Sequence, residues 1–120
     1  AAARETIAAL GAGAIARLHE LGEHLREGLE RAIRDTGVVA NVTGIGSGWI
    51  LNWRADPPVT FRQAVDADFD RAEEFRRQML DAGVLLAPYP ITDNRFSAAT
   101  SVDDIEETLE AARRAMQRVR

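Results

Sequence analysis

The hydrophobic pattern of this chain changes its period at Val38, and the change indicates a small α+β domain. From Ile15 to Ala32, apolar residues recur three or four positions apart, as on a helix with one buried face. From Val38 to Trp53, apolar and polar residues alternate instead, as in strands that are buried on one side. A glycine-rich segment, residues 44–48, joins two alternating runs, so the sequence predicts an antiparallel hairpin.

Two more apolar stripes at helical spacing follow the hairpin, in residues 65–79 and 102–119. Gly83 ends the first of these helices, because glycine readily adopts the left-handed conformation found after a helix. Ser101 and Asp104 form an S-x-x-D capping box at the start of the second. The predicted order is helix, hairpin, helix, a connecting stretch and helix.

The stretch between these last two helices holds the candidate site. Its apolar run 84–87 predicts a short buried strand, and residues 96–99 predict a second one. Two prolines, which cannot donate ladder hydrogen bonds, end the first strand and expose a loop around Tyr89. Arg95 follows at the mouth of that loop. An arginine between two buried strands is the place in this chain where polar chemistry is best supported.

The predicted fold class is α+β, with a small, mainly antiparallel sheet of about four strands and helices packed on one of its faces. Trp49 and Trp53 lie on the same side of their strand, so their large apolar rings need cover. The helices of this chain could supply it, and so could another domain. Residues 1–10 favour a helix but lack a capping residue, as expected of a chain that begins inside a helix.

Three patterns resemble ligand sites but have simpler explanations. The glycines of residues 44–48 precede a strand, whereas a phosphate-binding loop needs a helix N-terminus after it. The acidic run from Asp66 lacks the glycine and glutamate that a calcium loop requires, and it suits the first turn of a helix. His19 and His24 point about 140° apart on a helix, so they make a poor metal pair. We expect no metal site.

The composition excludes several kinds of chemistry. All 15 basic residues are arginines, so no lysine is present to form a Schiff base. The absence of cysteine excludes disulfides and thiolate catalysis, and it fits a reducing, cytoplasmic location. A net charge of -4 without a basic, aromatic patch argues against nucleic acid as a partner. A membrane is not expected either, because no apolar run approaches ~20 residues.

Three segments together resemble one known protein family. They are LHELGEHLREGLERAIRDTGV at 18–38, VTGIGS at 42–47, and the motifs GVLLAP and NRFSAATSVDDIEETLEAARRAM within 83–116. In this order they resemble the C-terminal small domain of class III, fold type I aminotransferases, and most closely the glutamate-1-semialdehyde 2,1-aminomutase branch. The resemblance covers nearly the whole chain. It implies that residues 1–13 end a linking helix and that residues 14–120 are the small domain.

The resemblance also implies a cofactor and partners. The family uses pyridoxal phosphate, bound by a large domain that carries the Schiff-base lysine, and the lack of lysine in this sequence agrees with that division. The small domain would cover the active site and contact a small-molecule amino substrate. The whole enzyme would be a homodimer, and this chain by itself would be inactive.

Two side chains, those of Arg95 and Tyr89, are candidates for substrate binding. We identify no candidate for catalysis or for cofactor binding in this chain. Arg95 lies where many class III aminotransferases place an arginine that holds a substrate carboxylate, which a planar guanidinium can bind through two parallel hydrogen bonds. The aminomutase branch commonly lacks that arginine, so its presence favours transamination. The alternative for Arg95 is a surface ion pair with Asp93. Tyr89 could line the same pocket through its hydroxyl, or be an exposed loop residue.

The leading hypothesis is therefore part of a pyridoxal-phosphate-dependent aminotransferase or aminomutase that acts on an amino acid or amino-aldehyde. The alternative is a free-standing α+β module that binds a ligand or dimerises without catalysis, with its open sheet face as the interface. A large domain with a lysine, encoded upstream of Ala1, would distinguish the two.

Overall fold

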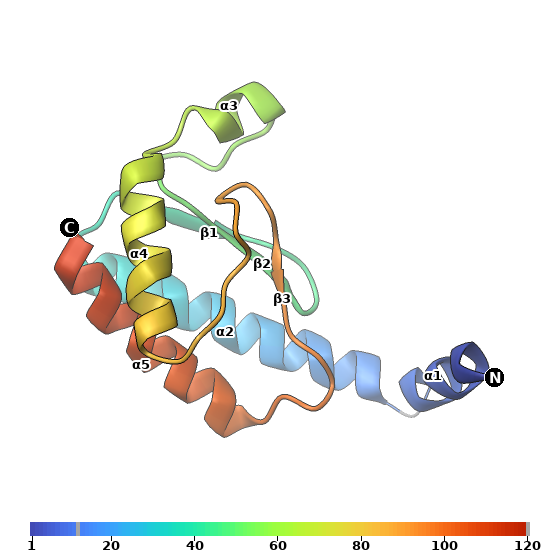
Figure 1. Ribbon diagram of the computed structural model, residues 1–120. Coiled ribbons are helices and arrows are strands. Elements are labelled where there is room, and N and C mark those ends of the chain that lie inside the picture. The colour runs from blue at the N-terminus through green and yellow to red at the C-terminus, as the bar shows by residue number, and fades with distance from the viewer. Residues whose placement is uncertain (12, 120) are drawn as a thin grey trace.

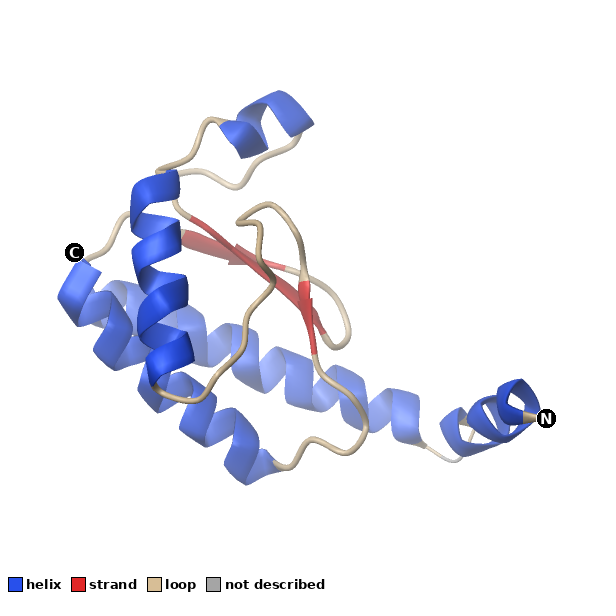
Figure 2. Cartoon of the chain, in the orientation of Figure 1, coloured by secondary structure: helices blue, strands red, loops and turns tan. Residues whose placement is uncertain are grey.

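The computed structural model describes residues 1–11 and 13–119 and has the predicted α+β class (Figure 1, Figure 2). The predicted ranges 1–13 and 14–120 each contain one residue, Ala12 or Arg120, that lies outside the described residues. In chain order the elements are α1 (Ala2–Leu10), α2 (Ala14–Thr36), β1 (Asn41–Thr43), β2 (Gly48–Asn52), α3 (Phe61–Val65), α4 (Phe69–Asp81), β3 (Asn94–Arg95) and α5 (Val102–Val119).

Helices α2 and α5 pack side by side along the base of the molecule (Figure 1). The predicted stripe of α2 is buried in its central part, where Leu25 and Leu29 are among the most enclosed side chains. Gly28 permits close contact between the helices, because a Cβ at this position would lie 2.4 Å from a methyl carbon of Leu109 in α5. Gly37 ends α2 in the left-handed conformation, with φ of 73°.

The predicted hairpin is confirmed, and it forms a sheet of order β1-β2-β3 in which both neighbouring pairs are antiparallel. Trp49 and Trp53 are buried, and they belong to the same core cluster as the apolar residues of α2, α4 and α5. The centroid of the Trp53 ring lies 5.4 Å from that of Phe75 in α4. The helices of this chain therefore supply the cover that both tryptophans need.

Apart from Ile50, the paired residues on the other face of the hairpin are polar. Asn52 donates from Nδ2 to Asn41 Oδ1 at 3.0 Å and to Thr43 Oγ1 at 3.1 Å. These cross-strand bonds satisfy side chains that do not face the apolar core. One-sided burial of the sheet, inferred from the alternation, is consistent with this pattern.

The predicted strands 84–87 and 96–99 are wrong, and the described residues form three strands, one fewer than expected. The amide N–H of Ala87 donates to the side-chain Oδ1 of Asn94 at 2.8 Å. A side chain thus satisfies a donor that would pair with a neighbouring strand. Strand β3 forms one edge of the sheet and ends one position before the second predicted run, because the backbone of β2 pairs with Asn94 and Arg95.

The stripe predicted as one helix over 65–79 is divided between α3 and α4. Asp68 caps the second helix, since its Oδ1 accepts a hydrogen bond from the amide of Arg71 at 3.0 Å. Val65 consequently lies outside α4 and is 39% exposed. The acidic residues near this cap stabilise a helix N-terminus, as the sequence predicts; Asp70 lies in the first turn.

Helix α1 lies apart from the rest of the fold (Figure 1), and none of its residues is buried. Gly13 adopts a φ of 80° just before α2 begins. Among the described residues, no helix combines the length and the apolar character that crossing a membrane requires.

Candidate functional site

Arg95 lies in the edge strand β3, and its side chain is 76% exposed. Its Nε donates a hydrogen bond to Asp93 Oδ2 at 2.5 Å. This bond holds the pKa of the Asp93 carboxyl below its usual range. The ion pair that the sequence offered as the alternative role of Arg95 is therefore present in the structure.

A hollow of about 280 Å³ opens beside Arg95. One wall is the turn of the β1–β2 hairpin, including Ser47 and Gly48, and the other consists of Asp93 and Arg95. Gly48 is the sheet partner of Arg95, so the turn and the arginine are held in register by β-pairing. The hollow therefore lies directly beside the guanidinium, with the paired Asp93 carboxyl on the same wall.

Tyr89 lies at a different hollow from Arg95. The residue is 69% exposed and lines a narrow space of about 30 Å³ together with Trp49 and Phe75. The space is mainly apolar, and Arg76 of α4 lies on its rim. Trp49 borders both spaces, but successive residues of β3 separate them: Asn94 lines the apolar space and Arg95 lines the hollow, and neighbouring strand residues point to opposite faces of the sheet.

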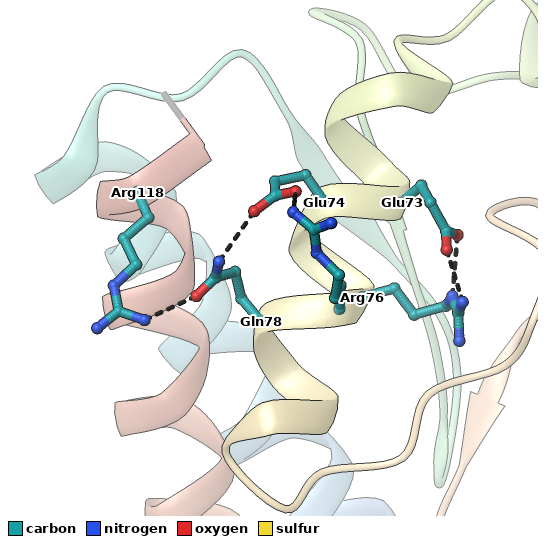
Figure 3. Close-up of polar contacts among 6 residues, drawn as sticks. Glu73, Glu74, Arg76, Gln78 and Arg118 are labelled. Atoms are coloured by element: carbon teal, nitrogen blue, oxygen red, sulfur yellow. Dashed lines mark hydrogen bonds and ion pairs between the residues drawn. The ribbon is translucent and has the colours of Figure 1, made fainter.

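The polar contacts of α4 connect it to α5 (Figure 3). Gln78 donates to Glu74 Oε1 at 2.9 Å and accepts from Arg118 Nη1 of α5 at 2.7 Å. Arg76 forms two hydrogen bonds with Glu73, at 2.9 and 2.6 Å, which lower the pKa of the Glu73 carboxyl and raise that of the guanidinium. These exposed contacts orient side chains at the helix surface and contribute little stability.

The histidines are not gathered into a metal site. His24 contacts Glu106 across the α2–α5 interface, while His19 lies near Gly46. Within residues 1–11 and 13–119, no group of three or more histidine, aspartate or glutamate side chains is arranged to hold a metal ion.

Curated relatives match this chain along most of its length, although no family model matches it. It is 35% identical over 107 residues to a protein named glutamate-1-semialdehyde 2,1-aminomutase from Thermomicrobium roseum, and 32% identical over 104 residues to one of the same name from Thermus thermophilus. These matches cover 89% and 87% of this chain. The chain is homologous to part of the class III aminotransferases. It spans about a quarter of the length of these relatives, 25% and 24%.

Solved structures agree with this relationship. An omega-transaminase from Sphaerobacter thermophilus matches 92% of this chain with a TM-score of 0.81 and 27% identity, and the match covers 25% of that protein. A transaminase with PLP bound has a TM-score of 0.74 at 19% identity over 90% of this chain and 24% of its own, which supports the fold. The resemblance to a class III aminotransferase small domain is confirmed, and pyridoxal phosphate is the cofactor of that family.

The structure also reveals two residues of this aminotransferase segment that the sequence analysis missed. Arg26 of α2 donates a hydrogen bond to the carbonyl of Gly46 in the hairpin turn, and Arg17 of α2 donates one to the carbonyl of Ala98, three residues after Arg95. The sequence holds a signal for the first of them, because Gly22 interrupts a strong helix one turn earlier, and a glycine there indicates a close backbone approach.

Proposed function

We propose that residues 14–120 are the small domain of a pyridoxal-phosphate-dependent aminotransferase or aminomutase, and that residues 1–13 end a linking helix. The observation that carries this proposal is the match of 89% of the chain to 25% of an aminomutase. The rest of such an enzyme would be a large domain. The exposure of α1, which buries no residue against this domain, supports a linking role.

The large domain would hold the cofactor, because the residues of this chain do not fit a covalently anchored pyridoxal phosphate. The anchor is a lysine, and this sequence contains none. The contribution of this chain would be to cover the active site, exclude water and bind the substrate. By itself it would be inactive. Its partners would be its own large domain and a second subunit in a homodimer, in the cytoplasm.

We propose that Arg95 binds the carboxylate of the amino substrate. Asp93 occupies Nε, so Nη1 and Nη2 are the donors that face a ligand end-on, and two parallel N–H groups match a carboxylate. The adjacent hollow of about 280 Å³ provides the space. We also propose Tyr89 as a substrate contact, because its exposed side chain would add a hydroxyl to the apolar space that Trp49 and Phe75 line.

The substrate class would be an amino acid or an amino-aldehyde that retains a carboxylate. The presence of Arg95 favours transamination between two molecules, because the aminomutase branch commonly lacks an arginine at this position. An amino-donor screen distinguishes the two reactions, because a transaminase needs a keto or aldehyde acceptor, whereas an aminomutase converts a single substrate without one.

Borohydride trapping tests the role of the chain. We expect pyridoxal phosphate to give an imine absorbance band on the full polypeptide that carries these 120 residues, and borohydride to abolish this band by reducing the imine to a stable secondary amine. Neither change should occur on the 120 residues alone. If neither protein binds the cofactor, the proposal is wrong and a binding or dimerisation module becomes the better explanation.

Arg95→Ala tests the clamp in the full enzyme. The variant should weaken carboxylate substrates by about 1.5–3 kcal/mol, the scale of a hydrogen bond to a charged group. Amine donors without a carboxylate serve as the internal control, since their kinetics should not change. Equal kinetics of variant and parent with every carboxylate substrate would exclude the clamp.

A further inference from the structure

The hairpin turn beside Arg95 rests directly on helix α2. A Cβ at Gly22 would lie 1.7 Å from the carbonyl oxygen of Gly46, far inside van der Waals contact. Gly46 itself has φ of 58°, and the amide of Gly48 closes the turn by donating to the Ile45 carbonyl at 2.9 Å. The position of this turn is thus set by a backbone-to-backbone contact with α2.

Arg26 holds the same turn from one helical turn further along α2. Its Nη1 donates to the carbonyl of Gly46 at 2.8 Å and to that of Gly48 at 3.1 Å. The side chain is partly buried, so these charge-assisted bonds are shielded from water. One guanidinium therefore fixes the carbonyl groups at both ends of the segment that turns the chain into β2.

Gly48 transmits this position to the candidate clamp. It is the register partner of Arg95 in the β2–β3 pair, and a Cβ on Gly48 would lie 3.6 Å from Asp93 Oδ2. The hairpin turn, Asp93 and Arg95 are the walls of the hollow. A displacement of the turn would therefore change both the width of the hollow and the direction of the guanidinium.

We propose that Arg26 is a positioning residue for carboxylate binding, acting through the Gly46 and Gly48 carbonyls on the hollow at Arg95. The proposal rests on the clamp function proposed above for Arg95. It assigns Arg26 no contact with the substrate. Its role is to keep the turn at the distance from β3 that lets a carboxylate reach the two Nη groups.

The first test measures the turn itself, without reference to activity. In the full polypeptide, Arg26→Met should speed amide hydrogen exchange of Gly48 and its neighbours by about tenfold or more, because the turn loses the charged donor of both hydrogen bonds. Arg34→Met removes the same charge from an exposed position of α2 and should leave these amides unchanged. Unchanged exchange in Arg26→Met refutes the proposal, whatever the role of Arg95.

The second test separates positioning from general destabilisation. Arg26→Met should raise KM for a carboxylate-bearing amino donor by about tenfold, with kcat and the KM of a carboxylate-free amine unchanged. Arg26→Lys should recover part of the loss in carboxylate binding, because an ammonium group can also donate to both carbonyls. This variant also serves as the test if Arg26→Met does not fold.

The outcomes distinguish this inference from the proposed function. If Arg95→Ala raises the carboxylate KM and neither Arg26 variant does, the clamp stands and the role of Arg26 is refuted. If Arg95→Ala has no effect, the clamp fails and the role of Arg26 in carboxylate binding fails with it, while the exchange measurement shows separately whether Arg26 holds the turn. An equal loss for both donor types in Arg26→Met would show a purely structural role and would also refute the proposal.

Discussion

Gly22→Ala is the most direct test of how the hairpin turn is seated. The new Cβ would lie 1.7 Å from the Gly46 carbonyl oxygen and 2.8 Å from its carbon, whereas ordinary contacts begin near 3.4 Å. Because both of these atoms are backbone, a side-chain rotation cannot relieve the overlap. The turn must move away from α2, and the Arg26 hydrogen bonds to Gly46 and Gly48 must lengthen.

The expected size of the effect follows from opposing terms. Overpacking of this kind costs about 1–3 kcal/mol, and each of two weakened hydrogen bonds costs about 1 kcal/mol. Replacing glycine by alanine inside a helix returns about 1 kcal/mol. We therefore expect Gly22→Ala to lower the free energy of unfolding by about 2–4 kcal/mol, measured by urea denaturation.

Gly28→Ala is the matched control on the same helix. Its Cβ would also be crowded, at 2.4 Å, but all three neighbouring atoms belong to the side chain of Leu109, and the two nearest are its terminal methyl groups, so a change of rotamer can relieve the overlap. The same gain in helix propensity applies to both variants. Gly22→Ala should thus be clearly the more destabilised of the two. Equal stability of the parent and Gly22→Ala, or a larger loss in Gly28→Ala, would refute this account of the turn.

Two further predictions concern stability. Phe75→Ala removes a fully buried ring that packs on Trp53, so we expect a loss of about 3–5 kcal/mol in urea denaturation, against a much smaller loss for Phe61→Ala at an exposed position. Hydrogen bonds from Ser101 lower the pKa of the Asp104 carboxyl in the folded chain. The ionised carboxylate therefore stabilises the fold at pH values above the pKa of the unfolded chain, and this stabilisation is lost as the pH falls through the pKa of the folded chain. Asp104→Asn should make stability less sensitive to acid over that interval, and an unchanged pH profile would contradict the capping box.

The sequence by itself determined the features that depend on near neighbours along the chain. The helical stripe around Leu25, the alternation through Trp49 and the capping box at Ser101 each involve residues a few positions apart, and each is present. Helix periodicity and caps are local because their hydrogen bonds join residues three or four apart. The family resemblance likewise came from the order of such local motifs.

The tertiary structure alone decided which distant groups meet. Residues 84–87 have strand-like composition, but the Ala87 amide donates to the side chain of Asn94 and not to a strand backbone, so the run stays irregular. In the sequence, Arg26 cannot be told from an arginine on the helix surface. In the structure it donates to the carbonyls of Gly46 and Gly48, which lie 20 and 22 residues further along the chain. Strand pairing and the walls of a hollow depend on how separate elements pack, and the local spacing of apolar residues does not determine which distant elements meet.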